Sequence, residues 1–214
     1  MAMARGGAIV LILLVLTFAM LAAWSSNRRT DYFPQDLNHA VSACEVAPGV
    51  FEQQVVLEEG VDRWLSAELA DVGEPSLYRR PASLPRSVRL TWLGTFRHPV
   101  VVRVDTLQNG QQQLTAKKGA SGAGFGPAGD PVEARKMVRV LTPAEATGLR
   151  IVVDRARLFS APPSGCRRRI DEGRWVLEGA DPQAGYRYRS VQSPKEDERA
   201  LGLYLLGLAG WDNF

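Results

Sequence analysis

The chain has 214 residues, of which 26 are Lys or Arg and 23 are Asp or Glu, so its formal net charge at pH 7 is only +3. This balance excludes the strong basic field with which many proteins hold nucleic acid, and we expect no nucleic-acid partner. The cysteines and the two histidines, His39 and His98, match no compact zinc spacing, so we expect no metal and no cofactor.

An apolar segment, residues 8–24, dominates the N-terminal end, with Thr17 as its only polar side chain. As a helix rising about 1.5 Å per residue it spans roughly 26 Å, close to the roughly 30 Å of a bilayer core. The pattern predicts membrane contact through residues 6–24. Two interpretations stay open: an uncleaved single-pass transmembrane anchor, or a signal peptide cleaved before Ser26.

The short flank that precedes this segment is typical of an export signal. We therefore expect the body of the protein in the periplasm, held at the cytoplasmic membrane, or secreted if the signal is cleaved. The chain divides into a membrane segment at residues 1–24, a polar linker at residues 25–49 and one extracytoplasmic domain at residues 50–214. Such a domain is long enough to bury a core of its own.

The first half of this domain predicts one helix and then three strands. Apolar residues at helical spacing indicate a helix over roughly residues 52–70. Alternating and β-branched patterns indicate strands at residues 88–92, 100–104 and 111–117, with Asn109-Gly110 as a hairpin turn. Together the strands predict an antiparallel meander.

A second helix and a second hairpin follow. Thr142, Pro143 and Glu145 carry the residue types of a capping box with proline in the first turn. Strands are expected at residues 174–178 and 186–189. After the N-terminal transmembrane helix, the fold class is therefore α+β, with antiparallel β-hairpins or a meander in one sheet and the helices packed on one face.

The last element expected is a leucine-rich helix near the C-terminal end. Ser193 should cap this helix and Gly210 should end it. Three leucines recur at positions i, i+4 and i+7, so they should be buried against the sheet: Leu201, Leu205 and Leu208.

The two cysteines, Cys44 and Cys166, are expected to form a disulfide. An even cysteine count in an exported domain favours this pairing, because the compartment is oxidising. The bond would close a loop of about 120 residues and stabilise the domain by roughly 4–5 kcal/mol through loop-closure entropy.

No catalytic motif emerges from the sequence. The glycine-rich stretch at residues 119–130 is followed by neither a P-loop lysine nor a helix pattern, so nucleotide binding is not expected. No G-x-S-x-G elbow is present to expose a nucleophilic serine. The catalytic residues, if the protein is an enzyme, are therefore unknown from the sequence.

Aromatic side chains near the C-terminal end suggest a binding surface. Trp175, Tyr186 and Tyr188 alternate with arginines, which would suit stacking against a glycan or a peptide. The alternative is a strand with one buried and one solvated face. Trp211 joins this candidate surface if the sheet covers only one side of the last helix.

Several stretches of the chain resemble a group of uncharacterised exported or membrane-anchored proteobacterial-type proteins. The resemblance is carried by residues 96–104, 175–179, 185–188, 193–194 and 201–210, and the likeness covers about half of the exported body. It implies a shared fold. It implies no activity, cofactor or site residue, because the group has none to carry over.

The function expected from these patterns is that of a non-enzymatic envelope protein or accessory subunit that binds another protein. The alternatives are a secreted hydrolase without a familiar motif and a glycan-binding module. An enzyme should have a concave pocket with convergent polar groups and perturbed titratable residues. A protein-binding module should instead have an exposed apolar patch or an open strand edge.

Overall fold

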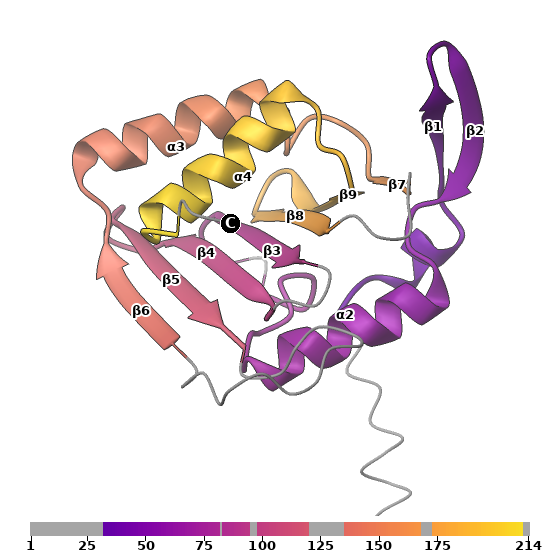
Figure 1. Cartoon of the computed structure of the whole chain (residues 1–214). Coiled ribbons are helices and arrows are strands. Elements are labelled where there is room, and N and C mark those ends of the chain that lie inside the picture. The colour runs from indigo at the N-terminus through magenta and orange to yellow at the C-terminus, as the bar shows by residue number, and fades with distance from the viewer. Residues whose placement is uncertain (1–31, 82, 95–97, 120–134, 168–172, 212–214) are drawn as a thin grey trace, which may run out of the picture. The chain divides into compact units, whose positions relative to one another are not determined.

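The computed structural model describes residues 32–81, 83–94, 98–119, 135–167 and 173–211 (Figure 1). In chain order the elements are η1 (Gln35–Asn38), β1 (Val41–Ala47), β2 (Val50–Val55), α2 (Glu59–Asp71), β3 (Ser87–Leu93), β4 (Val100–Thr106), β5 (Gln112–Lys118), β6 (Arg135–Val140), α3 (Pro143–Arg155), β7 (Ser164–Cys166), β8 (Arg174–Asp181), β9 (Gly185–Val191) and α4 (Glu196–Leu208).

Seven of the strands form one sheet, in the order β6-β5-β4-β3-β8-β9-β7. The strands β3 to β6 are antiparallel neighbours in a meander, and the β8–β9 hairpin joins this meander through β3. Leu90 of β3 lies opposite Leu177 of β8, so segments far apart in the sequence meet at the centre of the sheet. The short strand β7 pairs with β9 in parallel.

Helices cover both faces of this sheet, which corrects the expectation that they pack on one face (Figure 1). One apolar core joins α3 and α4 to the sheet, and a second core joins η1 and α2 to the opposite face. The strand β4 shows the physical reason. Val100 and Val102 belong to the first core and Val101 to the second, so this run is buried on both sides.

The transmembrane helix of the predicted fold also needs correction. In the part of the chain that the structure describes, no helix is both long enough and apolar enough to cross a bilayer. The three α-helices have 13 residues each, fewer than the roughly 20 that a membrane span needs. The predicted segment at residues 1–24 lies outside the described residues. The described domain is α+β, with a mostly antiparallel sheet and three α-helices.

The two C-terminal helices begin differently from each other. The capping box predicted for α3 is confirmed: the Thr142 side chain accepts from the backbone N–H of Glu145, whose carboxylate accepts from the backbone N–H of Thr142. The cap predicted at Ser193 is wrong, because α4 starts at Glu196 with Lys195 before it. There the Glu198 carboxylate accepts from the Lys195 backbone N–H at 3.3 Å.

The burial predicted for the leucines of α4 is confirmed. These three side chains lie in the core on the α3 and α4 face of the sheet: Leu201, Leu205 and Leu208. Leu203, between them, is 47% exposed and points away from that core. Gly210 follows the helix with a positive φ of 68°, a backbone conformation that glycine adopts without steric cost.

The folded domain starts earlier than the predicted boundary at residue 50. Within the stretch assigned to a linker, residues 25–49, Tyr32 and Phe33 are buried in the core beneath α2. The strand β1 follows them and pairs with β2. The helix expected over residues 52–70 therefore begins only at Glu59, because the residues before it form β2.

Candidate functional site

A two-stranded hairpin, β1–β2, stands apart from the main sheet, next to β7 (Figure 1). Its strands are antiparallel and are joined by a turn at Pro48 and Gly49, where Gly49 has a positive φ of 74°. An isolated two-stranded hairpin is at best marginally stable in water. Something other than its own ladder must therefore hold it in place.

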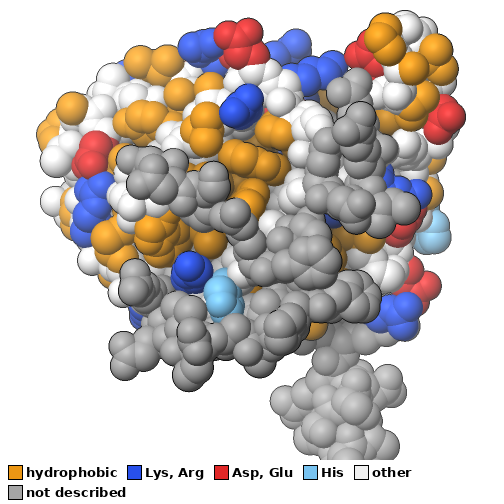
Figure 2. All heavy atoms as spheres, viewed as in Figure 1, with side chains coloured by type: hydrophobic (Ala, Val, Ile, Leu, Met, Phe, Trp, Pro, Cys, Tyr) orange, Lys and Arg blue, Asp and Glu red, His pale blue; other side chains and the backbone are white. Residues whose placement is uncertain are grey.

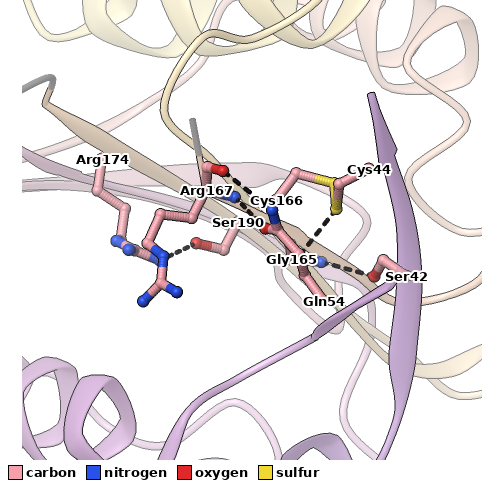
Figure 3. The surroundings of a disulfide bond; sticks show 8 residues. All are labelled: Ser42, Cys44, Gln54, Gly165, Cys166, Arg167, Arg174 and Ser190. Atoms are coloured by element: carbon pink, nitrogen blue, oxygen red, sulfur yellow. Dashed lines mark hydrogen bonds between the residues drawn. A yellow bond between two sulfur atoms is a disulfide. The ribbon is translucent and has the colours of Figure 1, made fainter. Parts of the chain in front are cut away.

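One face of the hairpin is fastened to β7 (Figure 3). Cys44 forms a disulfide with Cys166, with the two Cα atoms 5.5 Å apart, so the predicted disulfide is confirmed. Ser42 Oγ accepts from the backbone N–H of Gly165 at 3.0 Å. The Gln54 side chain accepts from the backbone N–H of Arg167 at 2.8 Å and donates to its carbonyl at 3.2 Å.

Gly165 allows the hairpin to pack closely against β7. A Cβ atom at that position would lie 1.8 Å from the carbonyl oxygen of Val56, so a side chain there would push the hairpin away from β7. The Cys44 Sγ atom also lies 3.4 Å from the Gly165 carbonyl oxygen, and since a disulfide sulfur carries no proton this is a packing contact. The hairpin is thus held by one covalent bond and by hydrogen bonds to backbone.

The opposite face of the hairpin is apolar and exposed, and we call it the hairpin face. Because side chains alternate along a strand, the residues between the fastening side chains point the other way. Val41 is 61% exposed, Phe51 62% and Val55 39%, and Ala43 is also exposed. Figure 2 shows hydrophobic side chains gathered on the hairpin at the upper right, with acidic side chains beside them. Such patches commonly mark docking sites.

A groove of about 500 Å³ adjoins this face. The hairpin contributes Ala43, Glu45 and Phe51 to its lining, and the ends of α3 and α4 contribute charged residues. Two ion pairs neutralise part of that charge, Arg155 with Asp197 and Arg189 with Glu198, each at 2.9 Å. The lining holds no histidine to activate one of its serines.

The densest charge cluster lies under α2, on the other side of the sheet from α3 and α4. Arg89 and Glu178 are both fully buried and form two hydrogen bonds of 2.8 Å. Glu74 accepts from Arg103 and forms an ion pair with Lys117 at 2.8 Å. Opposite charges are paired throughout, and they tie the segment after α2 to the sheet. This cluster serves the fold, because each of its charged groups already has a partner of opposite charge.

Tyrosines next to this cluster have displaced pKa values. Burial, and then the charge of Glu178, raise the pKa of Tyr186, whose hydroxyl donates to Glu178 at 2.8 Å. Burial also raises the pKa of Tyr188. Both phenols thus stay protonated: half-buried Tyr186 donates its hydrogen bond to Glu178, and Tyr188 packs in the core beneath α2.

The structure does not bring the predicted aromatic surface together. Trp175 packs in the core of α3 and α4, where the space beside Gly202 is filled by its ring, and Trp211 is half-buried against the same core. Tyr186 and Tyr188 belong to the opposite face of the sheet, and Tyr188 is fully buried. These side chains cannot stack together on one ligand.

The remaining candidates for chemistry are also separated. His39 is exposed at the end of η1, and His98 is half-buried just before β4. Both thiols are consumed by the disulfide, which removes them as nucleophiles and as metal ligands. Across the described ranges, no group of three metal-ligating side chains gathers in one place.

The hairpin was missed in the sequence, although it left a trace there. The Pro48-Gly49 dipeptide is typical of a turn, and apolar strand-forming residues stand on both sides of it. With this geometry in place, comparison with known proteins adds no family: the chain matches no protein-family model, and no curated protein is similar to it in sequence.

Proposed function

We propose that this protein is a non-enzymatic, extracytoplasmic binding protein that docks another protein on its hairpin face. The observation that carries the proposal is the contrast between the two faces of the hairpin. One face is fastened by a disulfide and by hydrogen bonds, and the other exposes Val41, Phe51 and Val55. These side chains contribute little to folding, so a partner is the simplest reason for their exposure.

The way in which the hairpin is fastened also favours binding. A partner that met a loose hairpin would lose affinity to the entropy of ordering it. Here the disulfide and the Gln54 hydrogen bonds order the hairpin before a partner arrives. A disulfide of this kind persists in an oxidising compartment, which supports a location outside the cytoplasm.

A hydrolase is less well supported. Among the described residues, those with the largest pKa displacements are Glu145, Tyr186 and Tyr188. The glutamate caps α3, and the tyrosines are bonded or packed beneath α2. None of them lines the groove beside the hairpin. An active site would instead gather such groups in one concave pocket.

Site-specific photocrosslinking in the native host tests the proposal. Benzoylphenylalanine replaces Phe51 in one full-length variant and Ile151 in the other; Ile151 is a matched control because it is 52% exposed but lies on α3. We expect one predominant adduct from position 51 and none from position 151. Adding Val41→Lys to the position-51 variant should abolish the adduct without lowering the melting temperature, because Val41 is exposed and contributes little to folding.

Two results would overturn this proposal. One is equal crosslinking from both positions, which would mean random collision. The other is an adduct from position 51 that persists with Val41→Lys, because a partner held by apolar contact on the hairpin face loses affinity when a charged side chain replaces Val41.

A further inference from the structure

We propose that the partner binds by strand addition: an extended segment of about six residues, bearing lysine or arginine, pairs with the free edge of β2. This inference rests on the proposed function and names the kind of partner. It follows from three features of β2: the direction of its backbone groups, the lack of edge protection and the charge around it.

The hydrogen-bond pattern shows which backbone groups of β2 face outward. The Val56 N–H donates to the Ala40 carbonyl at 2.9 Å, in register with the pairing of Val41 with Val55. In an antiparallel ladder the inward and outward groups alternate along each strand. The backbone groups of Glu52 and Gln54 therefore face β1, while the N–H and carbonyl groups of the residues between and beside them face away: Phe51, Gln53 and Val55.

These outward groups have no strand opposite them in the described part of the chain, where β1 is the one strand that pairs with β2. They belong to the residues whose side chains form the hairpin face. A partner strand at this edge would therefore gain backbone hydrogen bonds and apolar contact together. This combination is how an extended peptide adds to a sheet edge.

The edge of β2 also lacks the usual protection against pairing. Natural edge strands carry prolines or charged side chains, above all lysine, that discourage pairing with a second chain. One edge strand of the main sheet, β6, reads RKMVRV and has three basic residues. The strand β2 reads VFEQQV, with one charge and no proline, and five of its six residues are exposed. Of these two edges, β2 is the one suited to accept a partner.

The charge of the hairpin region selects the partner. The two strands of the hairpin and their turn, residues 41–55, contain two glutamates, Glu45 and Glu52, and no lysine or arginine, although the whole chain has a net charge of +3. A segment with basic side chains complements this region and is guided to it. A second copy of the hairpin would instead bring two acidic regions of the same sign together, which electrostatic complementarity does not favour.

The test uses the oxidised protein and three synthetic octapeptides. The first alternates lysine with valine, the second alternates glutamate with valine, and the third is the lysine peptide with alternate backbone nitrogens methylated along one edge. We expect the lysine peptide to bind, and the other two to bind at least about tenfold more weakly, because charge complementarity or backbone donors are lost.

Amide hydrogen exchange shows where the peptide binds. Bound lysine peptide should protect the amides of Phe51, Gln53 and Val55 and leave those of Glu52 and Gln54 unchanged, since these already face β1. Gln53→Pro should weaken binding at least about tenfold, while the control Gln53→Ala, which keeps the N–H, should bind as the wild type does.

Three outcomes would overturn strand addition. They are equal binding of all three peptides, protection that does not alternate along β2, and a concentration-dependent dimer that shows the same protection without peptide. If any of these occurs while crosslinking from position 51 remains specific, the proposed function survives and only the mode of docking fails. If position 51 gives no specific adduct while the lysine peptide still binds to β2, the edge of β2 can accept a strand but the proposed function, docking of a native partner on the hairpin face, is wrong.

Discussion

The main sheet and the β1–β2 hairpin are held in place by different kinds of interaction. The sheet lies between two apolar cores, one formed with α3 and α4 and the other with α2. The hairpin has apolar side chains, but several of the largest face solvent, and its attachments are the disulfide and the polar contacts of Ser42 and Gln54.

This difference shows how a protein can expose apolar surface without losing its fold. Where burial provides the stability, apolar side chains must point inward. Where a covalent bond and hydrogen bonds provide the attachment, the apolar side chains on the far face are free for another task. The comparison predicts that the two regions respond differently to changes in redox state, buried charge and pH.

Removal of the disulfide should have the largest effect. In Cys44→Ala/Cys166→Ala the free energy of unfolding should fall by about 4–5 kcal/mol, because the bond spans 122 residues and restricts the unfolded chain. Hydrogen exchange should accelerate most in β1 and β2, while β3 and β4 remain the slowest to exchange. Chemical denaturation and exchange measure the two effects. A hairpin that stays as protected as in the oxidised protein would break the comparison.

Loss of the buried charge pair should weaken the main sheet and leave the hairpin unaffected. Arg89→Leu leaves Glu178 buried without its partner, and we expect unfolding to become easier by about 3–5 kcal/mol. The control Arg89→Leu/Glu178→Leu should recover most of that loss, because no charge then remains uncompensated. Urea denaturation of both variants decides this, and equal destabilisation by the two would contradict it.

Acid should produce the smallest loss of stability, and this loss should again come from the main sheet and its helices and not from the hairpin. Hydrogen bonds from Arg139 and Thr142 lower the pKa of Glu145 from 4.5 to about 2. The carboxylate therefore stabilises the folded state above pH 4.5, and this contribution is lost as the pH falls from about 4.5 to 2. Because the side chain is partly exposed, we expect about 1 kcal/mol or less.

Glu145→Gln should remove this acid-dependent loss, which thermal melts between pH 5 and 2.5 measure. The hairpin should stay attached over the same range, because its anchors at Ser42, Cys44 and Gln54 do not titrate. Faster exchange in β1 and β2 than in α3 as the pH falls would show that the two regions are not independent in this way.

Local sequence patterns predicted the elements that local interactions specify. The capping box at Thr142 starts α3 where expected, and the Asn109-Gly110 turn joins β4 to β5. The disulfide followed from cysteine count and export. The start of α4 was placed two residues too early. The residue that precedes the helix is Lys195, whose backbone N–H bonds to Glu198 in the first turn, and not Ser193.

Other features depended on residues far apart in the sequence. Nothing near Arg89 in the chain indicates that Glu178 will be opposite it, since their pairing follows from the contact of β3 with β8. The same contact puts Tyr188 beneath α2, away from Trp175, although both belong to one hairpin of alternating pattern. Both faces of β4 are buried because helices lie on both sides of the sheet, and the run of valines in β4 does not by itself predict the second helix layer.

By itself the sequence determined the local elements, the capped start of α3 and the cysteine pair, because turn geometry, capping and thiol chemistry act over a few residues or on one pair. Only the tertiary structure decided which side of each strand is buried. For the hairpin this decision rests on Gly165, which lets β7 approach one face closely and leaves Phe51 and its neighbours exposed on the other. The alternation of side chains along a strand turns that single contact into a fastened face and a free one.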